Sequence, residues 1–100
     1  MGLGRKSLAE EYLNEVPEEE NRSDATWLVL YDFDVKPNPR FWLNLRRLVR
    51  LVGEGSLVQY SVFMTRSRRG AIVAERLARH YGARVDVFKG EMVDFARMAS

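Results

Sequence analysis

The sequence predicts an α+β domain in which two helices cover one face of an antiparallel sheet. Two segments have the periodicity of amphipathic helices, and they alternate with segments rich in Val, Phe and Tyr, which are typical of strands. The expected order is strand, helix, one or two strands, helix, strand. A chain of 100 residues without cysteine is long enough for one domain held by a hydrophobic core alone.

The first strand and helix are expected in the first half of the chain. Residues 26–34 contain a continuous apolar run that ends in acidic residues, as in a central strand. A helix then begins at Pro39, because Asn38 is a suitable N-cap and proline is favoured in the first turn, and Gly53 is a natural stop. The buried stripe of this helix is expected to contain Phe41, Leu45, Leu48 and Val52.

The second half of the chain completes the plan. Residues 56–65 are either one long strand or two short strands with a kink at 59–61. Ser67 caps a helix over 68–81, whose buried stripe is expected to contain Val73, Ala74, Leu77 and Tyr81. Residues 83–89 alternate as a last strand. This order predicts a ferredoxin-like βαββαβ fold over residues 26–90.

The two ends are expected to lie outside this domain. Residues 1–25 carry seven acids against three bases, and apolar residues recur every four positions at Leu8, Tyr12 and Val16. We expect a mobile acidic arm with marginal helicity over 7–16. It is either a solvated extension or a segment that folds over basic helix faces and imitates nucleic acid. The tail, 91–100, is either helical or a strand at a dimer interface.

The basic residues gather on the two expected helices, opposite the apolar stripes. Residues 26–100 carry 13 bases against seven acids, and 11 of these bases are arginine, whose planar guanidinium suits phosphate. Sign segregation on two independent elements predicts a nucleic-acid-binding surface. Its candidate residues are Arg40, Arg46, Arg47 and Arg50 on the first helix, and Arg68, Arg69, Arg76 and Arg79 on the second.

Composition excludes several chemistries. Without cysteine there is no thiol nucleophile, disulfide scaffold or Cys-ligated metal. A single histidine, His80, disfavours a catalytic triad, and we expect it to interact with the dipole at a helix end. No apolar run exceeds five residues, so no membrane partner and a cytoplasmic location are expected.

Two carboxylates remain as candidates for chemistry. Asp32 and Asp34 follow the first apolar run and lie on the same face of the strand. They either bind Mg²⁺, which prefers oxygen ligands, or simply solvate the end of the strand. Because two carboxylates are few for such a site, a second subunit or substrate phosphates would have to complete it. Aromatic residues that either stack on bases or belong to the core are Tyr60, Phe63 and Phe88.

Two short motifs resemble the CRISPR-associated "Cas two" family. The first is Leu30-Tyr31-Asp32-Phe33, and the second is Gln59-Tyr60-Ser61-Val62-Phe63. The resemblance spans residues 26–90. The residues that match the family pattern are Tyr31, Asp32, Gln59, Ser61 and Phe63.

The resemblance carries implications for partners and activity. It implies a homodimer in which Asp32, as catalytic metal ligand, faces its copy across the two-fold axis. It also implies a Mg²⁺-dependent endonuclease on RNA or DNA, or the structural centre of a spacer-integration complex with the Cas one integrase.

We favour a homodimeric nucleic-acid-binding subunit of CRISPR adaptation over an efficient nuclease. No residue besides Asp32 and Asp34 offers base or nucleophile chemistry. The alternatives are a non-catalytic RNA-binding module and a toxin-like ribonuclease on the same fold. An RNA-recognition motif would need a glycine–aromatic signature that residues 61–65 lack.

Overall fold

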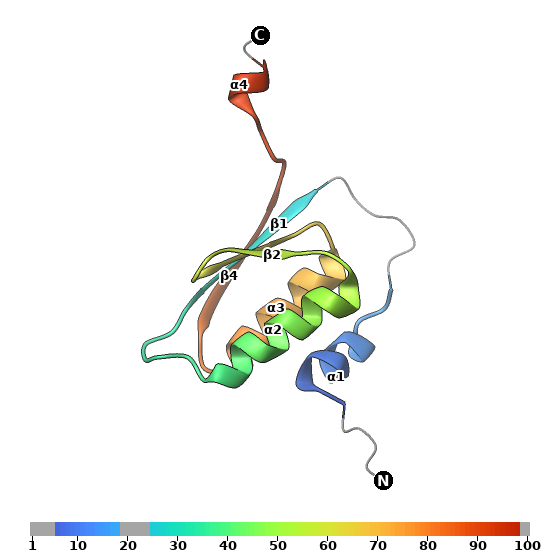
Figure 1. Cartoon of the computed structure of the whole chain (residues 1–100), viewed down its shortest axis with the longest axis vertical. Helices are drawn as coiled ribbons and strands as arrows, with labels where there is room; N and C mark the ends of the chain where they lie inside the picture. The colour runs from blue at the N-terminus through green and yellow to red at the C-terminus, as the bar shows by residue number, and fades with distance from the viewer. Residues whose placement is uncertain (1–5, 19–24, 99–100) are drawn as a thin grey trace.

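The structure is a computed structural model that describes residues 6–18 and 25–98. Two long helices lie along one side of a four-stranded sheet, and a shorter helix packs beside them (Figure 1). The elements in chain order are α1 (Leu8–Glu15), β1 (Thr26–Asp32), α2 (Pro39–Val52), β2 (Ser56–Gln59), β3 (Val62–Thr65), α3 (Arg68–His80), β4 (Arg84–Gly90) and α4 (Phe95–Met98).

The sheet has the strand order β2-β3-β1-β4, and all its neighbours are antiparallel. Helix α2 connects two strands that have β3 between them, and α3 connects two strands that have β1 between them. Interleaved connections of this kind define the split βαβ arrangement. The predicted α+β fold with a βαββαβ core and an antiparallel sheet is therefore confirmed.

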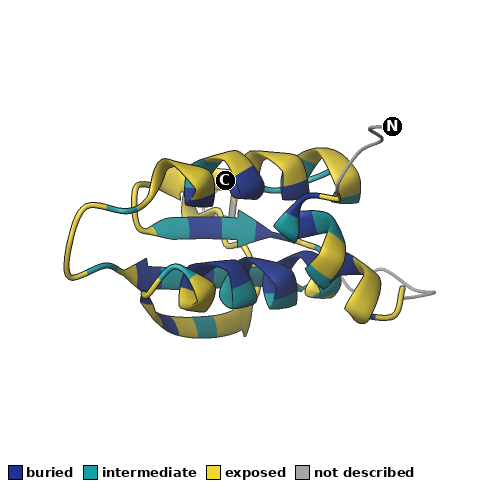
Figure 2. Cartoon of the chain, turned by 90° about the horizontal axis from the view of Figure 1, so that it is seen from below, coloured by how far each residue is buried: buried dark blue, intermediate teal, exposed yellow. Residues whose placement is uncertain are grey.

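The core lies between the sheet and the two long helices. Alternate residues of the strands point towards the helices, so that Val29 and Phe63 are almost fully buried. Each long helix has an exposed side and a buried side (Figure 2). The predicted stripes are buried, except that Val52 and Tyr81 are half-buried. Because the stripes follow the helical period, both helices pack on the same face of the sheet.

The helix caps explain where α2 and α3 begin and end. The Asn38 side chain accepts a hydrogen bond from the Arg40 backbone N–H at 2.9 Å, and the Ser67 hydroxyl accepts one from Gly70 at 2.9 Å. Gly53 ends α2 with a φ of 85°, in the left-handed region that favours glycine. Residues 56–65 form two strands, the second of the two alternatives, with an irregular register near Gln59.

The N-terminal stretch differs from the expected separate arm. Helix α1 packs against α2 and α3, and Ala9, Leu13 and Val16 are buried in the common core. The Ala9 backbone N–H also donates a 3.0 Å hydrogen bond to Oδ1 of the buried Asn44. The domain therefore includes residues 7–16, because their apolar positions form a face wide enough to cover the seam between two helices. The remainder of the expected arm, residues 1–5 and 19–24, lies outside the described residues.

The C-terminal tail forms a single helical turn, α4, after a short irregular segment. In the described part of the tail no strand follows β4, so the expected interface strand is not formed in one chain. Met92 and Phe95 are 69% and 76% exposed. Among the described residues, no helix is long and apolar enough to cross a lipid bilayer.

Candidate nucleic-acid interface

The four candidate arginines of α2 are all exposed. Within the described part of the chain, none of their side chains makes a hydrogen bond or ion pair. Arg46 and Arg50 line a groove between α2 and the edge strand β2. Arg40 and Arg47 are seven residues apart and so share another side of the helix. These side chains can contact an anionic ligand without giving up an existing partner.

The groove beside α2 has a volume of about 420 Å³ and a mostly apolar lining. Its floor includes Leu45, Val49 and the ring of Phe63. Gly55 lies so close to Phe63 that an added Cβ would come within 2.8 Å of that ring, and its φ of 122° also requires glycine. The backbone of Gly55 therefore closes one end of the groove tightly over Phe63.

The candidate arginines of α3 are placed differently. Arg69 donates from Nε to the Val16 carbonyl at 2.8 Å and from Nη2 to the Leu13 carbonyl at 2.7 Å. These carbonyls lie at the C-terminal end of α1, where backbone acceptors lack helical partners. Arg76 pairs with Glu15 at 3.2 Å, and Glu18 lies 3.8 Å from Arg69. Two of the predicted phosphate ligands thus hold α1 in place.

The other two arginines of α3 are exposed. Arg79 donates to the Val85 carbonyl at 3.3 Å and lies 3.9 Å from Glu75, while Arg68 is near the start of the helix. The predicted surface over both helices is therefore divided. Glu15 and Glu18 pair with Arg76 and Arg69 in the α3 row, whereas the α2 row has no acidic partner among the described residues.

Asp32 and Asp34 lie close together but share one cation. Arg84 lies directly opposite Asp32 in the β1–β4 register, and its Nη2 is 2.9 Å from Asp32 and 3.0 Å from Asp34. The hydrogen bond with Asp32, followed by the charge of Asp34, raises the pKa of Arg84. All three side chains are more than 70% exposed, so these pairs contribute little to stability.

The two carboxylates of one chain do not fit a Mg²⁺ site by themselves. The described residues contain no cluster of three or more Asp, Glu, His or Cys side chains that could hold a metal. Mg²⁺ prefers octahedral oxygen coordination, whereas here a guanidinium occupies the space between the two carboxylates. Metal binding and catalysis by Asp32 stay predictions that require a second subunit or substrate phosphates to complete the site.

The two family-like motifs meet in space. The Tyr31 backbone N–H donates to the Ser61 carbonyl at 3.0 Å, and Phe63 pairs with Val29 across β1 and β3. The Tyr31 ring is buried, and burial raises the pKa of its hydroxyl, which has no partner among the described residues. Gln59 is exposed at the end of β2. Tyr31 and Phe63 therefore belong to the core, whereas Gln59 and Ser61 are exposed.

His80 and the three predicted stacking residues do not form one site, because the fold places them in different environments. His80 is exposed at the end of α3, and its Nδ1 lies 3.3 Å from the Tyr12 hydroxyl. Phe63 belongs to the core, whereas Phe88 and Tyr60 are 57% and 85% exposed. The sequence could not separate these aromatic residues, because exposure depends on which strand face the helices cover.

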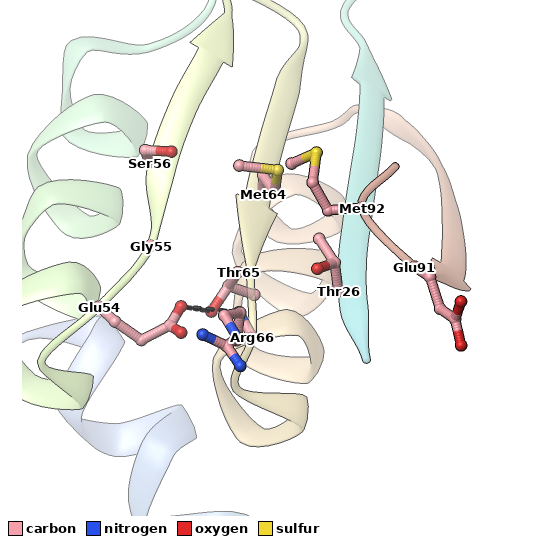
Figure 3. Close-up of a pocket in the computed structure, with 9 residues that line it drawn as sticks. All are labelled: Thr26, Glu54, Gly55, Ser56, Met64, Thr65, Arg66, Glu91 and Met92. Atoms are coloured by element: carbon pink, nitrogen blue, oxygen red, sulfur yellow. Dashed lines mark hydrogen bonds between the residues drawn. The ribbon is translucent and has the colours of Figure 1, made fainter. Parts of the chain in front are cut away.

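A second hollow, of about 560 Å³, lies at the opposite end of β3 from Tyr60 (Figure 3). Two carboxylates line it, Glu54 and Glu91, and Glu54 points towards Thr65 and Arg66. Glu54 Oε1 accepts hydrogen bonds from the Thr65 hydroxyl at 2.6 Å and from the Arg66 backbone N–H at 2.7 Å. These contacts fix the entry to α3, so Glu54 has a structural role.

Comparisons with known proteins identify no relative. No protein-family model matches the chain, and neither a curated protein nor a solved structure matches it. The resemblance to the "Cas two" family therefore stays a prediction.

Replacing Arg69 should show that it supports the fold. Arg69→Ala removes two hydrogen bonds from a cation to the carbonyls at the end of α1, and we expect the free energy of unfolding to fall by about 2 kcal/mol. The matched control, Arg47→Ala on exposed α2, should change it by less than about 0.5 kcal/mol. Urea denaturation followed by circular dichroism measures both, and equal stability of the two variants would contradict this role of Arg69.

Proposed function

We propose that this protein is a nucleic-acid-binding scaffold rather than an efficient nuclease. The observation that carries the proposal is a row of exposed arginines on α2 whose side chains have no partner among the described residues, namely Arg40, Arg46, Arg47 and Arg50. Guanidinium groups bind phosphate oxygens in a bidentate way, and phosphate contacts dominate the affinity of proteins for nucleic acids. A row without acidic partners retains its full positive potential for such a ligand.

The active form that we propose is a homodimer. The sheet face opposite the helices carries apolar side chains, of which Phe88 is 57% exposed and Leu28, Leu30, Val62 and Met64 are half-buried. Cross-strand pairs Leu28–Met64, Leu28–Phe88 and Leu30–Val62 make this patch continuous. A second copy on the same patch would give an isologous, two-fold contact and would double the number of arginine rows.

The biological setting that we propose is CRISPR adaptation, with the Cas one integrase as a partner. Support comes from the order and place of the two motifs: Asp32 ends the central strand β1, and the segment from Gln59 to Phe63 forms the adjoining hairpin. In this setting the protein holds DNA or RNA for another enzyme. Catalysis by this chain is not required, which agrees with the shared cation between Asp32 and Asp34.

Reversing charges on α2 should weaken binding. The double variant Arg40→Glu/Arg47→Glu places two repulsive groups in the row, so we expect at least a tenfold loss of affinity for a labelled oligonucleotide at low salt. The slope of log affinity against log salt should also become shallower by about one per lost phosphate contact. Fluorescence anisotropy measures both. Arg97→Glu, a charge change in α4, should retain the affinity, and equal losses would contradict a specific role for α2.

A cleavage assay separates scaffold from nuclease. Labelled RNA and DNA incubated with Mg²⁺ and the wild-type protein should be degraded no faster than with Asp32→Ala, because Arg84 occupies the space between the carboxylates. Denaturing gels measure the rates. Mg²⁺-dependent cleavage by the wild type that disappears in Asp32→Ala would assign catalysis to Asp32 and overturn the scaffold proposal.

A further inference from the structure

An exposed aromatic pair lies beside the arginine row. Tyr60, in the turn between β2 and β3, is 85% exposed, more than any other large hydrophobic side chain among the described residues. Its nearest ring is that of half-buried Trp42 on α2, at a centroid distance of 6.5 Å and an interplanar angle of 76°. Trp42 also lines the groove between α2 and β2. The pair therefore stands where the hairpin tip meets the groove.

Two cations lie on the same stripe of α2. Arg46 and Arg50 follow Trp42 at intervals of four residues, about 6 Å each along the helix axis, and both line the groove. Neither side chain makes an ion pair within the part of the chain that the structure describes. The Trp42 ring and the guanidinium groups of Arg46 and Arg50 thus follow one another along one stripe of α2.

We propose that the exposed ring of Tyr60, held edge to face against Trp42, is a stacking platform for an unpaired base, whose neighbouring phosphates bind Arg46 and Arg50. Aromatic side chains beside a positively charged groove are the usual means of binding single strands. The inference rests on the proposed function and names its ligand class, which is single-stranded nucleic acid or a duplex with unpaired nucleotides. Bases inside a blunt duplex are already stacked on each other and cannot use the platform.

The chemistry of the groove places the base at the rim. The floor, Leu45, Val49 and Phe63, offers no polar side chain to the donors and acceptors of a base edge, and the Ser56 hydroxyl lies among the exposed lining residues. A base stacked on the exposed ring of Tyr60 keeps its polar edge in water, so no such partner is needed. Binding should therefore tolerate any base, since every base has a π face.

The test uses the full chain and the variants Tyr60→Ala and Tyr60→Phe. Anisotropy titrations compare a labelled single strand with a blunt duplex of the same length, at the same salt concentration. Tyr60→Ala should bind the single strand about fivefold or more weakly, and Tyr60→Phe, which keeps the ring, within about twofold of the wild type. Duplex affinity should be equal in all three proteins. A 2-aminopurine in the single strand should be quenched by the wild type and not by Tyr60→Ala.

The outcomes separate this inference from the proposed function. If Tyr60→Ala binds the single strand as tightly as the wild type while Arg40→Glu/Arg47→Glu does not, the platform is overturned and the scaffold stands. An equal loss on single strand and duplex also overturns it, because stacking on an unpaired base cannot explain that loss. If the wild type binds neither ligand, both proposals fail. Because Tyr60 is 85% exposed, its replacement should leave the circular dichroism spectrum unchanged.

Discussion

The packing of Phe41 joins β1, α2 and the end of α3, and the proposed interface depends on this contact. This residue has no exposed surface, and its ring lies 5.1 Å from Tyr31 on β1, 5.0 Å from Trp42 on α2 and 6.1 Å from Tyr81 at the end of α3, all edge to face. The cluster fixes how α2 lies on the sheet. It thereby also fixes the side of α2 that faces β2, where Trp42 and the arginines of the groove are found.

Helix α1, which packs beside the two long helices, determines which arginine side chains are available to bind a ligand. The side-chain Oδ1 of buried Asn44 accepts a hydrogen bond from the Ala9 backbone N–H of α1, and its Nδ2 donates one to the Tyr81 hydroxyl at 3.3 Å. The Asn44 side chain therefore links α1 to the aromatic cluster. Once α1 is seated there, its C-terminal carbonyls lie beside Arg69 and its Glu15 lies beside Arg76. The guanidinium groups of Arg69 and Arg76 therefore bind α1. The α2 row has no such neighbour in residues 6–18 and 25–98, and the positive potential of the described surface is concentrated there.

The sequence predicted the elements of the fold well, because their signals are local. Asn38, Gly53 and Ser67 mark helix ends through contacts within a few residues, and the apolar stripes follow from the helical period. The missed features depend on contacts between distant segments. Arg84 meets Asp32 only through the β1–β4 register, and the role of Arg69 exists only because α1 docks. The exposure of Tyr60 likewise depends on the hairpin turn, which the sequence offered only as one of two alternatives for residues 56–65.

The central claim is that nucleic acid binds the arginines of α2, whereas those of α3 that hold α1 serve the fold. The most direct measurement is an NMR titration of the protein with a single-stranded oligonucleotide, following the Nε–H resonances of the arginine side chains. The account predicts shifts for Arg46, Arg47 and Arg50 together with the backbone of the hairpin tip, and an unchanged signal for Arg69, whose Nε–H is bound to Val16. Shifts of Arg69 and Arg76 with an unchanged α2 would contradict it.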